Sequence, residues 1–204
     1  YGVNMQVVRN VPTKWNRDTV VSHIPLQPGP KVILQGAYID PDRGGEELVK
    51  AMQYLPDVTL YVIGSGRAIP EMKTMASSNV VFMDRLPYQE LMSITSRCDL
   101  GLSLDKPKHE NYRLSLPNKL FDYWQAGIPV LASPMVEVER AMQQHQAGQI
   151  LQDWEPQIMA AQISAMLSSP EYSNWKNNAI VAGSKEIWEN EVRIIQNWIS
   201  ELSR

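Results

Sequence analysis

The amino-acid sequence predicts an α/β domain with a doubly wound, mostly parallel β-sheet, followed by an all-helical C-terminal segment. Short apolar runs alternate along the chain with amphipathic segments of helical spacing. The runs are continuous in apolar character, which is typical of strands that helices cover on both faces. Short connections between the runs and the helical segments favour βαβ units. The six runs are residues 32–34, 60–63, 80–83, 100–102, 130–132 and 149–151.

Helices are predicted between these strands by apolar residues at i, i+3, i+4 and i+7 spacing. One such stripe lies within residues 48–55 and a second within residues 91–98. A third helix is predicted from Pro117 to Gly127. Proline is tolerated at the first helical position, and glycine is favoured at the residue that ends a helix.

The ends of the chain differ from its centre. Residues 1–30 are rich in proline and poor in periodic runs, so we expect a linker there and place the α/β core at residues 31–154. Residues 155–204 are expected to be helical throughout. One predicted apolar stripe of this segment comprises Ile158, Ala161 and Ala165. The last helix carries Trp188 and Trp198, so it either packs on this domain or crosses to a part of the protein outside this chain.

Composition excludes several classes of function. With a net charge of -3 over 204 residues, the chain lacks the basic field that drives nucleic-acid binding. No apolar run is long enough to span a bilayer, and no secretory signal precedes the chain, whose start at Tyr1 suggests a fragment. The single Cys98 excludes an internal disulfide and favours a reducing, cytoplasmic location. His23, His109 and His145 are too scattered for a local zinc site.

The start of the helix at Pro117 is the strongest candidate for a binding site. Unpaired N–H groups and the macrodipole make a helix N-terminus attractive to anions such as phosphate. Lys119 lies in the first turn, where the dipole disfavours a lysine, so we expect it to face a bound anion at Asn118 and Lys119. The alternative is that Lys119 points into water. Asp122, one turn further on, either accepts hydrogen bonds from sugar hydroxyls or forms an ion pair with Lys119.

Other loops at the same edge of the predicted sheet add candidates. Arg43 follows the first strand and either binds phosphate oxygens or is a solvated surface arginine. Gly64 and Gly66 follow the second strand and allow a ligand or another backbone segment to approach closely. The long loop at residues 103–116 is expected to be irregular and functional. It contains three possible sugar contacts, which are His109, Glu110 and Ser115.

Together these segments resemble the C-terminal, Rossmann-like half of GT-B glycosyltransferases, in particular the retaining "glycosyltransferase group 1" family. The most specific stretch is LPNKLFDYWQAGIPVLAS at residues 116–133. Supporting motifs are GAY at 36–38 with RG at 43–44, VIGSG at 62–66, NVVF at 79–82, LPY at 86–88 and CDLGL at 98–102. YGV at residues 1–3 and VVRNVP at 7–12 resemble the family's interdomain crossover.

The resemblance implies a role for individual residues. Arg43 and Gly44 would contact the donor diphosphate, with Arg43 and Lys119 stabilising the leaving group during catalysis. The backbone at Asn118 and Lys119 would hold the distal phosphate. The remaining implied contacts are with the ribose, at Asp122, and with the base, at Leu86 and Tyr88.

The resemblance also implies the wider function. The donor substrate would be a nucleoside-diphosphate sugar, used without an obligatory metal or other cofactor in polysaccharide or glycolipid synthesis. The partner would be the protein's own N-terminal domain, missing here, without which the fragment would be inactive. Any contact with the inner face of the membrane would come through that domain.

Two departures from the family pattern keep other functions open. Ala37 stands where many members carry an arginine, and Leu114 stands where many carry the first of two acidic residues, so Glu110 is a possible substitute. One alternative is a fragment of a GT-B nucleotide-sugar epimerase, for which His109 and Glu110 are the candidate catalytic pair. The other is a non-catalytic interaction domain with the same fold.

Overall fold

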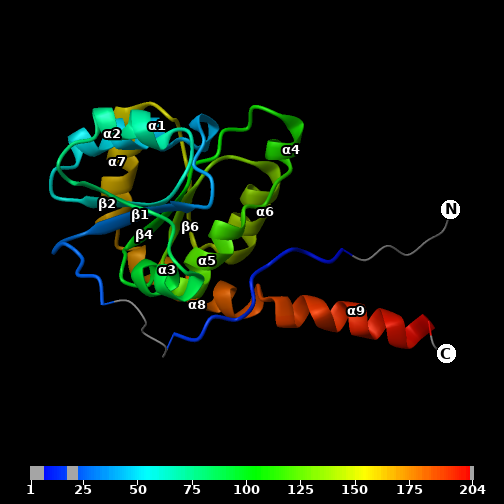
Figure 1. The fold of residues 1–204 in the computed structure, drawn as a ribbon. Helices are drawn as coiled ribbons and strands as arrows, with labels where there is room; N and C mark the ends of the chain where they lie inside the picture. The colour runs from blue at the N-terminus through cyan, green and yellow to red at the C-terminus, as the bar shows by residue number, and fades with distance from the viewer. Residues whose placement is uncertain (1–6, 18–22, 203–204) are drawn as a thin grey trace.

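The computed structural model describes residues 7–17 and 23–202, and the fold class predicted from the sequence is confirmed (Figure 1). Within these residues six strands form one parallel sheet in the order β3-β2-β1-β4-β5-β6. Every predicted apolar run overlaps a strand. The strands are β1 (Lys31–Gly36), β2 (Thr59–Gly64), β3 (Val80–Met83), β4 (Leu100–Ser103), β5 (Val130–Ala132) and β6 (Gly148–Ile150).

The strand order reverses between β1 and β4, at the centre of the sheet. In doubly wound folds the loops that leave the two central strands turn toward opposite faces. A crevice therefore opens outside their carboxyl ends, where ligands bind. The loop after β1 and the loop after β4 both border this crevice, so the topology directs attention to their residues.

Helices cover both faces of the sheet (Figure 1). One face carries α1 (Gly45–Ala51), α2 (Ile69–Met75) and α7 (Pro156–Leu167). The other carries α3 (Tyr88–Thr95), α5 (Asn118–Ala126), α6 (Val136–His145) and α8 (Tyr172–Lys185). The remaining elements are the 3-10 turns η1 (Pro41–Arg43) and η2 (Met52–Tyr54), the short helix α4 (Glu110–Arg113) and the terminal helix α9 (Trp188–Leu202).

Two apolar clusters, one on each face, hold these layers together. Successive residues of a strand point to opposite faces. In β1, Val32 and Leu34 therefore join the cluster with α1 and α7, whereas Ile33 joins the cluster with α5 and α8. All three side chains are fully buried. This two-sided burial explains why the strands appear in the sequence as unbroken apolar runs.

The structure corrects three details of the predicted secondary structure. The helix predicted from Pro117 begins at Asn118, with Pro117 as its N-cap. The loop at residues 103–116 is not wholly irregular, because it contains α4. In α7 the predicted stripe of Ile158, Ala161 and Ala165 faces away from the core. The buried positions of α7 are instead Met159, Ala160, Gln162, Ile163 and Met166.

The N-terminal segment lies along the domain and meets α9 (Figure 1). Residues 7–17 are irregular, as expected of a linker, and they bury Val11 and Trp15 against the core. The backbone N–H of Trp188 donates to the Pro12 carbonyl oxygen, and this hydrogen bond joins the segment to the start of α9. From there α9 extends away from the sheet, and Trp198 is 52% exposed. The predicted crossover motif at residues 1–3 lies outside the described residues.

No helix in residues 7–17 and 23–202 combines the length and apolarity needed to cross a bilayer. The three-part division of the chain at residues 30 and 154 stays a prediction.

Candidate functional site

A cavity of about 470 Å³ opens at the carboxyl edge of the sheet, beside the reversal of strand order. Its wall combines the ends of β1 and β2 with the loop after β3 and the first turns of α5. Six residues predicted from the sequence as site residues line it. They are Arg43, Gly64, Leu86, Asn118, Lys119 and Asp122.

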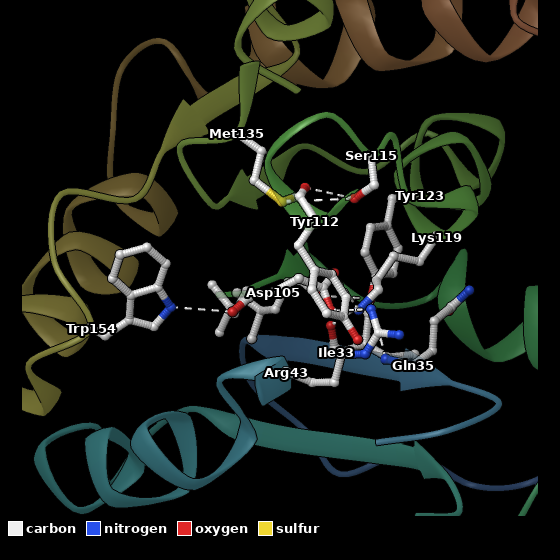
Figure 2. Close-up of polar contacts among 12 residues, drawn as sticks. Ile33, Gln35, Arg43, Asp105, Tyr112, Ser115, Lys119, Tyr123, Met135 and Trp154 are labelled. Atoms are coloured by element: carbon white, nitrogen blue, oxygen red, sulfur yellow. Dashed lines mark hydrogen bonds and ion pairs between the residues drawn. The ribbon is translucent and has the colours of Figure 1, made fainter. Parts of the chain in front are cut away.

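Arg43 and Lys119 share one buried carboxylate, that of Asp105 (Figure 2). Arg43 Nη1 lies 2.6 Å from Asp105 Oδ1, and Lys119 Nζ lies 3.1 Å from Asp105 Oδ2. The Asp105 side chain is 0% exposed, compared with 29% for Arg43 and 12% for Lys119. Burial alone would raise the pKa of Asp105, but the two cations hold it below its ordinary value. The carboxylate is therefore ionised and paired.

Both cations thus differ from the alternatives that the sequence left open. Arg43 is not a solvated surface arginine, and Lys119 neither points into water nor pairs with Asp122. Arg43 also stacks over the Tyr112 ring, with its Cζ 5.2 Å from the ring centroid. Two cations and one carboxylate leave the cluster with one net positive charge beside the cavity. Such a cluster favours an anionic ligand.

The N-terminus of α5 adds donors to the same wall. Its N-cap, Pro117, has no side chain that could accept from the first backbone N–H groups, and the first turn has no acidic residue. The helix ends at Gly127, which has a φ of 73° and is the C-cap predicted from the sequence. The unpaired N–H groups and the helix dipole favour negative charge at Asn118 and Lys119.

Tyr123 fixes α5 over the gap between the two central strands. Its buried hydroxyl lies 3.2 Å from the Ile33 carbonyl oxygen of β1 and 3.1 Å from the Leu102 carbonyl oxygen of β4. The ring occupies the space where Gly101 lacks a side chain, because a Cβ there would lie 2.3 Å from Tyr123 Cγ. The helix that carries Lys119 and Asp122 is therefore fixed to the reversal of strand order.

Asp122 lies at the cavity wall one turn along α5. Its carboxylate accepts hydrogen bonds from the Tyr88 hydroxyl at 2.9 Å and from Gln35 Nε2 at 3.1 Å. Thr95 Oγ1 donates to Gln35 Oε1 at 2.8 Å, which sets the orientation of the Gln35 amide. Burial raises the pKa of Asp122 to about 6, although both hydrogen bonds act to lower it. The group therefore titrates near neutral pH.

The glycines after β2 give space to backbone. A Cβ on Gly64 would lie 1.9 Å from the Gly36 carbonyl oxygen, and one on Gly66 would lie 2.2 Å from the Ile39 carbonyl oxygen. Both glycines have positive φ, at 143° and 150°. The sequence left open whether a ligand or another backbone segment approaches these glycines. In the structure, a backbone segment lies against both of them.

Six predicted site residues do not line the cavity. Gly44 packs on Leu104. Tyr88 is not part of the lining, but its hydroxyl donates to the carboxylate of Asp122, which is. Glu110 is exposed and pairs with Arg113, and the Ser115 hydroxyl donates to the Tyr112 carbonyl oxygen. The full set outside the lining is Gly44, Gly66, Tyr88, His109, Glu110 and Ser115.

Several lining or supporting residues were missed by the sequence analysis. Asp105 lies two residues after the buried strand β4, which is a usable signal for a residue at the carboxyl edge of the sheet. Gln35 is the last residue but one of β1, at the same edge. Arg85 stacks on Tyr38, with its Cζ 4.5 Å from the ring centroid, and both line the cavity. Apart from these positions at strand ends, no sequence pattern distinguished the missed residues from surface positions.

Residues 29–169 match the profile of the glycosyl transferases group 1 family. The chain belongs to this family. A relative is the GDP-mannose-dependent monoacylated alpha-(1-6)-phosphatidylinositol monomannoside mannosyltransferase of Corynebacterium glutamicum. It is 33% identical over 76 residues, which cover 34% of this chain and 20% of that protein.

Solved structures resemble the chain in fold. Sucrose-phosphate synthase from Thermosynechococcus elongatus superposes with a TM-score of 0.68 at 18% identity, covering 86% of this chain and 46% of that one. Alr3699/HepE from Anabaena, in complex with UDP and glucose, gives a TM-score of 0.68 at 16% identity, covering 85% and 48%. The chain therefore spans less than half the length of these proteins.

The described residues contain no group of three or more His, Cys, Asp or Glu side chains arranged to hold a metal ion.

Proposed function

We propose that this chain is the donor-binding half of a retaining glycosyltransferase and that its cavity holds a nucleoside-diphosphate sugar. The observation that carries the proposal is the meeting of Arg43, Lys119 and the N-terminus of α5 at one wall of the cavity. Membership of the glycosyl transferases group 1 family supports it. The UDP and glucose in the Anabaena structure support a nucleotide sugar as the ligand.

Each part of the donor has a chemical counterpart in the cavity wall. The diphosphate would contact Arg43, Lys119 and the backbone N–H groups at Asn118. The carboxylate of Asp122 would accept from the ribose hydroxyls, as acidic residues do in other nucleotide sites. The base would lie near Leu86, which lines the apolar part of the cavity.

The same groups would act in the reaction. Breaking the bond between the sugar and the diphosphate develops positive charge on the sugar and negative charge on the leaving oxygen. In this proposal Arg43, Lys119 and the dipole of α5 stabilise the negative charge without an obligatory metal. The acceptor would bind to an N-terminal domain that this chain lacks, so the chain alone would bind the donor without transferring the sugar. We place the whole enzyme in the cytoplasm, with any membrane contact made through that domain.

Calorimetry on this chain with UDP and GDP tests the donor site. We expect binding of at least one nucleotide, and an affinity about tenfold weaker for Lys119→Ala because a charge-assisted phosphate contact is lost. Lys176→Ala is a matched control, since Lys176 is an exposed lysine of α8 that does not line the cavity. If neither nucleotide binds the wild-type chain, with or without its sugar, the donor site is ruled out.

The two alternative functions are tested in the full-length protein. His109 and Glu110 do not line the cavity, so their position does not favour an epimerase. Unchanged activity of the full-length protein after substitution of Arg43 or Lys119 would favour one of these alternatives.

A further inference from the structure

We propose that Asp105 is a positioning residue of the anion site, whose carboxylate holds Arg43 and Lys119 so that both reach one diphosphate. The inference rests on the proposed donor-binding function and assigns to it a residue outside the cavity lining. Asp105 is not proposed to touch the donor, because its side chain is fully buried behind the two cations.

Asp105 counters the electrostatic repulsion between Arg43 and Lys119. Arg43 comes from η1 after β1, and Lys119 comes from the first turn of α5. Two like charges brought this close repel each other, more strongly where water is excluded. The Asp105 carboxylate offsets the repulsion by contacting both cations. Its Oδ1 lies 2.6 Å from Arg43 Nη1, and Lys119 Nζ lies 3.1 Å from Oδ2 and 3.4 Å from Oδ1. It thereby sets the distance between the two cations.

Arg43 and Lys119 keep N–H donors that Asp105 does not occupy and that a ligand could use. A guanidinium has five N–H donors and an ammonium has three, and one carboxylate cannot occupy them all. The Arg43 and Lys119 side chains remain 29% and 12% exposed. Both cations line the cavity, and the cluster keeps one net positive charge. Asp105 thus orders the cations without cancelling their attraction for phosphate.

Asp105 is itself held in place by the packing of the residues beside it. A Cβ on Gly44 would lie 2.5 Å from the Leu104 carbonyl oxygen, so the residues next to Arg43 and Asp105 pack backbone to backbone. The Lys106 N–H donates to the Asp42 carbonyl oxygen at 2.8 Å. On the other side Trp154 Nε1 donates to the Leu104 carbonyl oxygen at 3.2 Å (Figure 2).

Side-chain ion pairs strengthen this attachment. Lys106 pairs with Glu47, and Lys108 pairs with Asp42. Together with the backbone contacts, these pairs join the segment after β4 to the corner between β1 and α1. The carboxylate of Asp105 therefore occupies a fixed point against which both cations are aligned.

Asp105→Asn tests the inference, with binding of the preferred nucleoside diphosphate measured by calorimetry. Binding of the corresponding nucleoside is measured by ligand-observed NMR. We expect diphosphate affinity to fall about tenfold or more, and nucleoside affinity to change by less than about twofold. A merely structural role would weaken both ligands alike. Unchanged or tighter diphosphate binding, or an equal loss for both ligands, would overturn the inference.

A second pair of variants covers the case in which Asp105→Asn does not fold. Arg43→Gln is compared with the double variant Arg43→Gln/Asp105→Asn. The double variant leaves one unpaired cation, Lys119, whereas Asp105→Asn alone leaves two. Asp105 is proposed to act through Arg43 and Lys119, and the Arg43→Gln background already lacks one of these cations. We therefore expect adding Asp105→Asn to that background to lower diphosphate affinity only about threefold or less. A full tenfold loss would overturn the inference. A wild-type chain that binds no nucleotide overturns the proposed function as well, whereas normal wild-type binding with an unaffected Asp105→Asn overturns the inference alone.

Discussion

The Tyr88 hydroxyl donates a 2.9 Å hydrogen bond to the carboxylate of Asp122. The donor comes from the first residue of α3 and the acceptor from the middle of α5, so the bond joins two helices at the edge of the cavity. Burial nevertheless raises the pKa of Asp122 to about 6. The ionisation state of the Asp122 carboxyl therefore affects the part of the cavity where we place the ribose.

Nucleotide affinity is therefore expected to increase as the pH rises through about 6. The ionised carboxylate is the stronger acceptor for sugar hydroxyls and can use both oxygens, and it predominates above its pKa. Calorimetry over a pH series measures the effect. The phosphate also titrates in this range, so a 2′,3′-dideoxy nucleotide is the control. The ratio of the two affinities should rise with pH for the wild type and stay flat for Asp122→Asn; a flat wild-type ratio would contradict the ribose contact.

Asp105→Asn is expected to lower the free energy of unfolding at neutral pH by about 3–5 kcal/mol, because two cations lose their buried counter-charge. The pKa of Asp105 is depressed in the folded state, so its contribution is present above the ordinary aspartate pKa. It is lost as the pH falls through the depressed value. Urea unfolding should therefore show a gap between wild type and variant that closes in acid. A gap that persists unchanged there would argue against an ionised pair.

Gly66→Ala is expected to destabilise the fold by about 1–3 kcal/mol or more through backbone strain, because φ is 150°. The added Cβ would also collide with the Ile39 carbonyl oxygen. Gly36→Ala is the matched control at the same edge of the sheet, where the nearest atom to an added Cβ is a side-chain carbon at 3.4 Å. Thermal unfolding of the two variants measures the difference. Equal stability would mean that the backbone approach at Gly66 does not constrain the fold.

Gln125→Ala is expected to loosen the N-terminal segment. The Gln125 side chain accepts from the backbone N–H of Trp15 at 2.6 Å and donates to the Thr13 carbonyl oxygen at 3.1 Å. Leaving a buried donor unpaired costs about 1–3 kcal/mol. Limited proteolysis should therefore cut the variant faster within residues 7–17. Gln89→Ala, at an exposed position of α3, serves as the control and should be cut at the wild-type rate.

The strands and α5 could be predicted because their signals are local. Strands buried on both faces need unbroken apolar runs, and α5 carries its own start and stop residues at Pro117 and Gly127. The face of α7 could not be predicted in the same way. This helix is apolar nearly all round, so Ile158 was as plausible a core residue as Met159, and only packing against α1 decides between them.

The candidate site was predictable in part for a related reason. Lys119 conflicts with the local helix dipole, and this conflict marks it as a candidate site residue from the sequence alone. Asp105 carries no such conflict. Its significance depends on Arg43, 62 residues away along the chain, and the strand order that brings the two together is not written in any local pattern.

The reversal of strand order also has a consequence for how the site comes into being. Arg43 and Asp105 reach each other only when β1 and β4 pair, and Lys119 joins them only when α5 settles over that seam. Contacts so far apart in sequence are slow to form, because a long loop must close first. A ribosome-bound chain would therefore carry no diphosphate site until α5 had emerged. Nucleotide affinity would therefore appear only once β1 and β4 have paired and joined the two halves of the sheet.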